Sequence, residues 1–196
     1  MKALFLKHQH KLIVMIRLFL GFIFLGAGMS KLYFEHSFPG IIGPVWLKER
    51  LTEYGLGMYA RFIALSQVIA GLLLITQRFA TLGAVLTFPI ILNILMVTVS
   101  MEWRGTSFVN AFFLLLNSWL LAYDYHKFKF ILSDDKEAIS EISLKRRSAK
   151  ADLIWAVAAV VILTTIPLSY VNLYLAWGVC GAMFLLIIWN QLRKKV

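Results

Sequence analysis

Four successive apolar stretches of this chain each carry one strongly hydrogen-bonding side chain. These are Arg17, Gln67, Asn93 and Asn117. The arginine supplies a cation, and the three carboxamides both donate and accept hydrogen bonds. An arginine in hydrocarbon costs at least about 2.5 kcal/mol, so an ionisable group there is a functional candidate by default. We therefore predict a polar pocket around these four residues, with Arg17 as its cation.

A structural role for the same side chains is also consistent with the sequence. Carboxamides between membrane helices often act as interhelical contacts, each worth about 0.6 kcal/mol. Pro89 has no backbone N–H, which leaves the carbonyl of Val85 able to accept a hydrogen bond from Arg17. The binding and the packing interpretations both stay open at the level of sequence.

A second polar cluster is expected near the opposite ends of the same stretches. It comprises Lys31, Arg61, Glu102 and Asn110. Glu102 could form an ion pair with Lys31 or Arg61, or the cluster could bind a lipid head group or a small anion. Asn110 and Asn117 are seven residues apart and share one helix face, so the two polar groups could be connected.

Several other chemistries are excluded by residue type. Cys180 is the only cysteine, so the chain can form neither an internal disulfide nor a CxxC redox pair. The four histidines lie at helix ends or in loops, where they are poorly placed to ligate a haem inside a bundle: His8, His10, His36 and His126. No HExxH motif, phosphate-binding loop or Ser/His/Asp order is present. We predict no metal site, no evident cofactor beyond a lipid or quinone, and no identifiable catalytic motif.

The composition is that of an integral membrane protein. Of the 196 residues, 60% are hydrophobic and 15% are charged, whereas soluble domains are about half apolar and a quarter charged. The formal net charge is +10, but the basic residues cluster at the ends of apolar stretches. This distribution favours membrane lipids with anionic head groups as partners and gives no nucleic-acid-binding pattern.

Six apolar segments are long enough to cross about 30 Å of hydrocarbon. They are Leu12–Leu32, Tyr59–Thr76, Leu82–Met101, Phe108–Tyr125, Leu153–Tyr170 and Leu173–Trp189. The predicted fold class is all-α, a polytopic membrane helix bundle with six spans. In the first span, Gly21 and Gly28 lie on the face of Arg17 and Lys31, so a partner helix could pack closely there. This span is too long for a cleaved signal peptide, and we expect it to remain as an anchor.

The basic residues also predict the orientation of the chain. Fourteen of the twenty Lys and Arg residues lie in the two tails and in the connections after the second and fourth spans, and five lie on the other side. By the positive-inside rule, both termini are predicted to be cytoplasmic.

Two long connections divide the sequence. Residues 33–58 contain Pro and Gly followed by Trp46–Tyr54, a segment that predicts a short interfacial helix. The later connection is basic, and its SDDKEAISE stretch (residues 133–141) predicts a short solvated helix. We therefore expect a four-helix bundle over 1–126, a basic connection over 127–150 and a C-terminal helix pair over 151–196.

The first 125 or so residues resemble the DoxX family of small bacterial membrane proteins. The matching stretches are IRLFLGFIFLGAGMSKL, FPGIIGP, ARFIALSQVIAGLLLITQRFATLGA and FPIILNI. The resemblance implies a four-helix DoxX-like core in the bacterial inner membrane, and the two C-terminal spans lie outside that unit. The residues that fall on the family-like motifs are Arg17, Gly28, Lys31, Pro44, Gln67, Gly71, Arg78, Asn93 and Asn117.

Three functions follow from these observations as hypotheses. The first is an accessory subunit of a larger membrane assembly, with a lipid- or quinone-binding pocket in its bundle. The second is a quinone-linked oxidoreductase subunit, because DoxX proteins are similar to the small subunit of a thiosulfate:quinone oxidoreductase. A transporter is the third, although the sequence shows neither inverted repeats nor a second broken helix.

Overall fold

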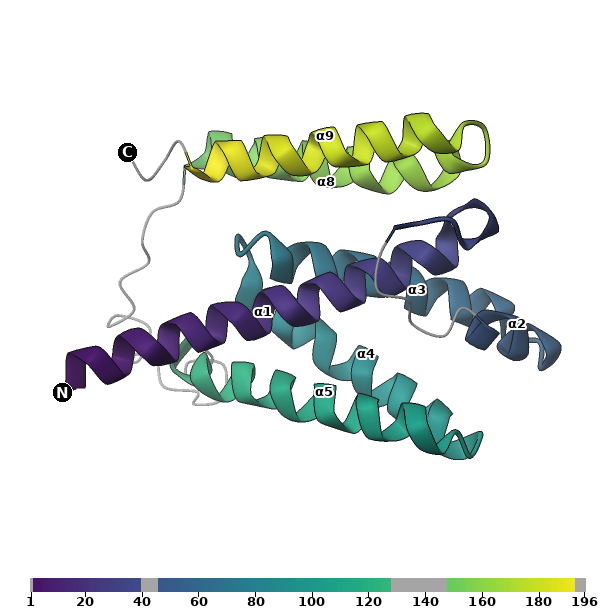
Figure 1. Cartoon of the computed structure of the whole chain (residues 1–196), viewed down its shortest axis with the longest axis horizontal. Coiled ribbons are helices and arrows are strands. Elements are labelled where there is room, and N and C mark those ends of the chain that lie inside the picture. Colours follow the sequence, from purple (N-terminus) through teal and green to yellow (C-terminus); the bar gives the residue numbers. More distant parts are fainter. Residues whose placement is uncertain (1, 40–45, 128–147, 193–196) are drawn as a thin grey trace, which may run out of the picture.

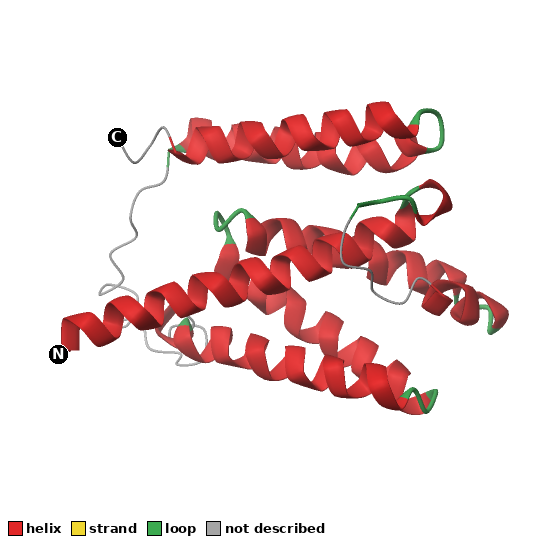
Figure 2. Ribbon diagram, in the orientation of Figure 1, coloured by secondary structure: helices red, strands yellow, loops and turns green. Residues whose placement is uncertain are grey.

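The computed structural model describes residues 2–39, 46–127 and 148–192. All regular structure in these ranges is helical (Figure 2). The helices are α1 (Lys2–Leu32), α2 (Trp46–Glu53), α3 (Gly57–Ile75), α4 (Ala80–Ser100), α5 (Arg104–Tyr123), α8 (Ala149–Ser169) and α9 (Leu173–Leu192), with single-turn helices η1 (Phe34–His36) and η2 (Tyr125–Lys127).

Six of these helices are long and apolar enough to cross a membrane. The predicted fold class, an all-α polytopic bundle, is therefore confirmed, and the chain is an integral membrane protein. The short helix expected over Trp46–Tyr54 is confirmed as α2. The Pro-Gly segment 40–45 and the helix expected over 133–141 lie outside the described residues.

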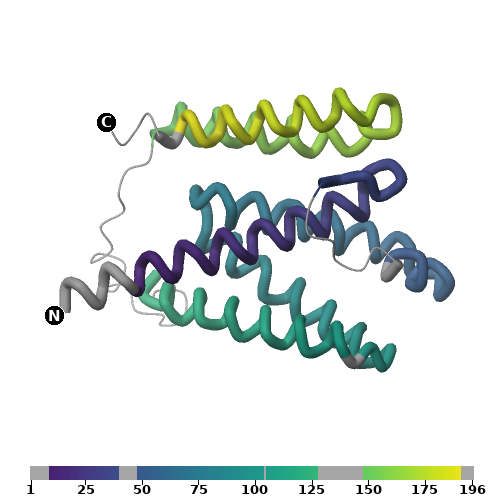
Figure 3. The backbone as a smooth tube through the Cα atoms, viewed as in Figure 1, coloured from purple at the N-terminus to yellow at the C-terminus, as the bar shows by residue number. Residues whose placement is uncertain are grey.

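Both chain termini lie at the same end of the molecule (Figure 3), which we call the termini end. The opposite end carries α2 and is called the α2 end. Figure 1 shows α1 running through the middle of the bundle, with the α8–α9 pair on one side and α5 on the other. A first apolar core joins α1, α3, α4 and α5, and a second joins one face of α1 and α3 to α8 and α9.

Helices α1 and α3 pack against each other through glycine. A Cβ atom placed on Gly71 would lie 2.5 Å from the backbone nitrogen of Leu25, and one placed on Gly28 would lie 2.6 Å from the carbonyl oxygen of Ala64. Only glycine permits such backbone proximity, which gains dispersion contacts that lipid cannot match. The close packing predicted from the glycine stripe of the first span is confirmed.

The α8–α9 pair is tied to the core by polar contacts at both ends. At the termini end, the guanidinium of Arg78 forms an ion pair with Asp152 at 2.5 Å. At the α2 end, the hydroxyl of Tyr33 lies 2.6 Å from that of Thr165. Burial raises the pKa of Tyr33 to about 12, so its phenol stays protonated and can serve in this contact. These contacts hold the α8–α9 pair against α1 and α3. The apolar sequence of α8 and α9 did not indicate that they would be attached to the core by polar side chains.

Candidate functional site

The structure does not gather the four predicted polar residues into one pocket. Arg17 pairs with Asp124, and Gln67 accepts a hydrogen bond from Lys31. Asn93 accepts one from the hydroxyl of Tyr59. Asn117 donates to the backbone carbonyl of Ala84 at 3.0 Å, which is a helix-packing contact between α5 and α4. Arg17 belongs to a cluster toward one end of the bundle, Gln67 and Asn93 belong to a second cluster toward the other end, and Asn117 belongs to neither.

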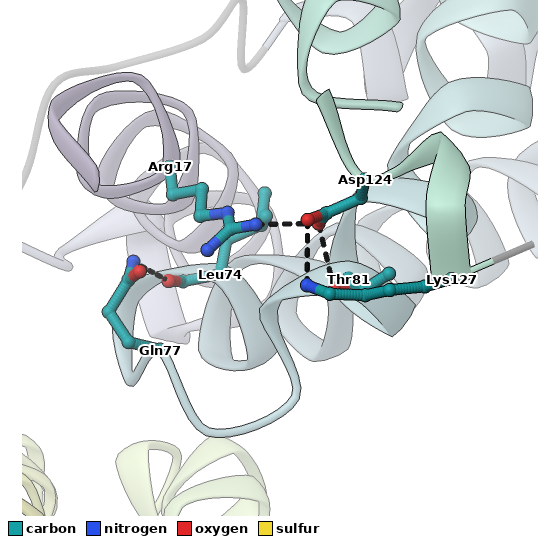
Figure 4. A network of polar contacts seen from close by, with 6 residues as sticks. All are labelled: Arg17, Leu74, Gln77, Thr81, Asp124 and Lys127. Carbon is teal, nitrogen blue, oxygen red and sulfur yellow. Dashed lines mark hydrogen bonds and ion pairs between the residues drawn. The ribbon is translucent and has the colours of Figure 1, made fainter. Parts of the chain in front are cut away.

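The first, which we call the Asp124 cluster, lies at the termini end (Figure 4). It comprises Arg17, Thr81, Asp124 and Lys127. Arg17 Nη2 lies 2.5 Å from Asp124 Oδ2, Thr81 donates to the same oxygen at 2.8 Å, and Lys127 Nζ reaches Oδ1 at 2.7 Å. The side chain of Asp124 is fully buried.

Electrostatics hold Asp124 in its charged form. Burial by itself would raise the pKa of this carboxyl, but hydrogen bonds from Lys127 and Thr81 and the charges of Arg17 and Lys127 outweigh it, and the pKa is lowered. Both carboxylate oxygens already have donors. Asp124 thus compensates the charge of Arg17 in the apolar span, and both of its carboxylate oxygens are occupied, although Arg17 Nε is buried without a hydrogen-bond partner among the described residues.

The second cluster, the Lys31 site, lies toward the α2 end. It comprises Lys31, Lys48, Tyr59, Gln67 and Asn93. Lys31 is only 5% exposed, and its ammonium donates to Gln67 Oε1 at 2.8 Å. Lys48 approaches from α2 and donates to the backbone carbonyl of Lys31 at 3.2 Å. Lys31 and Lys48, from two different helices, therefore line the same small space.

Lys31 is a buried cation without a counter-charge. Within the described part of the chain, no carboxylate forms an ion pair with it. Residues 40–45, in the connection that follows α1, contain no Asp or Glu. An ammonium group carries three donors, and the contact with Gln67 uses one. An uncompensated buried charge is costly, so this site is suited to an anionic or strongly hydrogen-bonding partner.

Three adjoining spaces run along α4 past this site. A small chamber of about 20 Å³ lies between Lys31, Tyr59 and Asn93, which is room for about one water molecule. A groove of about 390 Å³ adjoins it toward the middle of the membrane, lined by Phe62, Ile63, Ser66, Ile69, Leu86, Pro89, Ile90 and Asn93. A wider depression of about 730 Å³ lies beyond the chamber at the α2 end, between α2 and the end of α4.

The groove is open to the surroundings of the bundle. Phe62 is 64% exposed and Ile69 is 38% exposed on the surface of α3 that faces away from α1. Ile63 and Asn93 line both the groove and the chamber, so these two side chains separate the bilayer from Lys31. The Tyr59–Asn93 hydrogen bond joins α3 to α4 at this boundary.

The predicted outer cluster is only partly realised. Lys31 belongs to the Lys31 site, whereas Arg61 and Glu102 are exposed. Among the described residues, Glu102 forms no ion pair with Lys31 or Arg61. Asn110 is buried, but it donates to the carbonyl of Thr106 in its own helix. The buried lysine is therefore paired with Gln67 instead of Glu102.

Sequence reasoning missed Asp124, Tyr59 and Lys48. Asp124 had a usable signal, because it is an acidic residue inside the predicted span 108–125 and could have been matched with Arg17. Tyr59 and Lys48 had none, since Tyr59 stands at a span end, where aromatic residues are common, and Lys48 lies on the predicted interfacial helix, where a basic residue is unremarkable. Among the described residues, no group of three His, Cys, Asp or Glu side chains could hold a metal ion.

No protein-family model, curated protein or solved structure matches this chain. The resemblance to the DoxX family therefore stays a proposal carried by the sequence motifs.

Proposed function

We propose that the protein is an accessory subunit of a bacterial inner-membrane assembly whose helix bundle binds an amphiphilic molecule of the lipid or quinone class. The observation that carries the binding proposal is the buried ammonium of Lys31, which has unused donors and no carboxylate partner among the described residues. The ligand site is the Lys31 site, with Gln67 and Asn93 retained from the four residues expected from the sequence.

The surroundings of Lys31 support a ligand that is partly apolar. The adjoining groove has a volume within the range of small-molecule sites, about 300–1,000 Å³, and most of its lining is hydrocarbon. Arg17 and Asn117 lie outside the Lys31 site, because Arg17 pairs with Asp124 and the carboxamide nitrogen of Asn117 donates to the carbonyl of Ala84. A lipid and a quinone share the required chemistry, a polar head that accepts hydrogen bonds and an apolar body.

Native mass spectrometry of the protein extracted gently from its own membrane tests this proposal. We expect a bound mass matching a lipid or quinone in the wild-type protein, and its loss in K31Q. Arg61→Gln is the matched control, because Arg61 carries the same charge on α3 but is exposed and lines none of the three spaces. Absence of any bound amphiphile from the wild-type protein would contradict the binding proposal.

The accessory role and the oxidoreductase hypothesis need separate tests. Affinity purification from mildly solubilised native membranes is expected to recover membrane subunits together with this chain, and recovery of the chain alone would contradict the accessory role. If the chain is instead a quinone-linked oxidoreductase subunit, membranes from a deletion strain lose a thiosulfate- or other substrate-dependent reduction of quinone. Unchanged activity in those membranes would exclude that alternative.

A further inference from the structure

We infer that the ligand is an amphiphile with one hydrocarbon chain and an anionic head group, taken from the membrane leaflet at the α2 end through the groove between α3 and α4. This inference rests on the proposed function, since it specifies the ligand of the same Lys31 site. It assigns the head group to Lys31 and Lys48 and the chain to the groove.

The charge of the head group follows from what surrounds Lys31. The ammonium is buried beside an amide oxygen that provides only a partial negative charge. Lys48 adds a second cation on the chamber wall. A neutral ligand leaves the buried charge of Lys31 uncompensated, whereas a carboxylate or phosphate can form charge-assisted hydrogen bonds with Lys31 and with the partly buried Lys48. An anionic head group is therefore the complement of this site.

The single chain follows from the size and lining of the groove. Its volume of about 390 Å³ lies near the lower end of the range for small-molecule sites. A groove of that size between two adjacent helices fits one chain better than the two chains of a phospholipid. Its one conspicuous polar group besides Asn93 is Ser66, and the other lining side chains are apolar.

The chamber and the groove follow one another in the same order as the head group and the chain of a lipid in the leaflet at the α2 end. Along α3, the chamber is lined by Tyr59, Ala60 and Ile63, and the groove by residues from Phe62 to Ile69. The chamber thus lies about one helical turn, roughly 5 Å, nearer the α2 end than the groove. A lipid in that leaflet likewise places its head toward the α2 end and its chain toward the middle of the bilayer.

Entry of the head group requires Asn93 to move. The chamber holds about one water molecule while Tyr59 and Asn93 are hydrogen-bonded, and Asn93 stands between chamber and groove. Opening that bond merges the two spaces and frees a carboxamide and a phenol to contact the head group. Tyr59→Phe removes the bond without removing the ring, so this variant admits the head group more readily.

The experiment uses the full-length protein in nanodiscs of neutral phosphatidylcholine, with ligand binding followed by native mass spectrometry and thermal shift. Oleate is the principal probe. Oleyl alcohol has the same chain without the charge, and acetate has the carboxylate without the chain. Dioleoyl phosphatidate is an anion with two chains, and decyl-ubiquinone is a neutral quinone. We expect oleate to bind most tightly, with at least about tenfold preference over oleyl alcohol, the scale of one charge-assisted contact.

Matched variants locate the oleate on the protein. Lys31→Gln is expected to weaken oleate binding about tenfold or more, whereas Arg61→Gln leaves it unchanged. Ile69→Trp fills the groove and is expected to abolish binding, whereas Leu65→Trp is harmless, because Leu65 is similarly exposed on α3 but does not line the groove. Tyr59→Phe is expected to speed association. The tryptophan pair keeps the test decisive if Lys31→Gln fails to fold.

Each contrary result has a separate meaning. Equal binding of oleate and oleyl alcohol, or tighter binding of decyl-ubiquinone, overturns the anionic head group but leaves the proposed amphiphile site in place. If acetate binds as strongly as oleate, the site binds small anions, and the assignment of a hydrocarbon chain to the groove is overturned. If dioleoyl phosphatidate binds more tightly than oleate, the inference of a single chain is overturned. If none of these amphiphiles binds, both this inference and the proposed function fail.

Discussion

Arg17 and Lys31 lie on one helix, yet the protein compensates their charges differently. Arg17 meets a buried carboxylate that is itself held by Thr81 and Lys127. Lys31 meets only an amide oxygen. A buried ion pair whose remaining donors and acceptors are satisfied is stable once formed, and removal of one partner leaves a costly unpaired charge. Among the described residues, the charge of Arg17 is thus compensated by Asp124, whereas Lys31 has no carboxylate partner.

Asp124→Ala is expected to destabilise the protein by about 3–5 kcal/mol, because Arg17 is left buried without a counter-charge. The measurement is thermal unfolding in detergent. Arg50→Ala is the control, because the exposed Arg50–Glu53 pair contributes only about 0–1 kcal/mol. A double variant with leucine at both Arg17 and Asp124 is expected to recover much of the loss. Equal unfolding temperatures for Asp124→Ala and Arg50→Ala would contradict the role assigned to this pair.

The stability contribution of Asp124 also depends on pH. Its pKa in the folded protein is lowered from the ordinary value of 3.8, so folding favours the ionised carboxylate. The stabilisation is therefore complete above that ordinary value and is lost as the pH falls through the lower folded value. The difference in unfolding temperature between wild type and Asp124→Asn should therefore narrow as the pH is lowered from 7 to 3. A constant difference across this range would show that Asp124 does not titrate as described.

At the scale of elements, the sequence predicts where along the chain each helix lies, but it does not predict which helices contact one another. Apolar length alone located all six spans, because hydrocarbon thickness sets the length of a membrane helix. The glycines at 21 and 28 also indicated a close helix contact, which α3 supplies. The pairing of Arg17 with Asp124 joins residues 107 positions apart. No periodicity in one sequence specifies such a contact, so the expectation of one central pocket was wrong in its grouping.

Gly71→Ala is expected to destabilise the bundle by about 1–3 kcal/mol, the usual cost of overpacking. The added methyl group would meet the backbone of Leu25 at 2.5–2.8 Å, and a backbone cannot rotate away as a side chain can. Gly178→Ala in α9 is the matched control, since nothing lies within 4 Å of its added Cβ. Unfolding temperatures of the two variants in the same detergent provide the comparison, and similar values would contradict close α1–α3 packing.

At the scale of the whole molecule, the two clusters give the bundle a polarity along its axis. The ion pairs of Asp124 lie at the termini end, and Lys31, which has no carboxylate partner among the described residues, lies toward the α2 end. Most basic residues lie, by sequence, in the two tails and in the connections after the second and fourth spans, and the positive-inside rule predicts that these segments are cytoplasmic. This predicted orientation would place the Lys31 site toward the outer leaflet of the membrane.

Cysteine labelling in intact cells tests this orientation. Cys180→Ala first removes the single native cysteine. Glu53→Cys at the α2 end is then expected to react with a membrane-impermeant maleimide from outside, whereas Lys150→Cys at the termini end reacts only after the cells are permeabilised. Both positions are exposed. The reverse pattern would place the termini outside and move the Lys31 site to the cytoplasmic leaflet.

The distance along the chain between Arg17 and Asp124 has a consequence for biogenesis. Arg17 is synthesised 107 residues before its partner, which at about 5–20 residues per second is a delay of roughly five to twenty seconds. During that time α1 must hold its arginine in the membrane without the carboxylate, and the long side chain can reach toward the nearer head groups. We expect the guanidinium to pair with the carboxylate only after the end of α5 has been synthesised, so that the final environment of Arg17 in the first helix depends on completion of the fourth long helix.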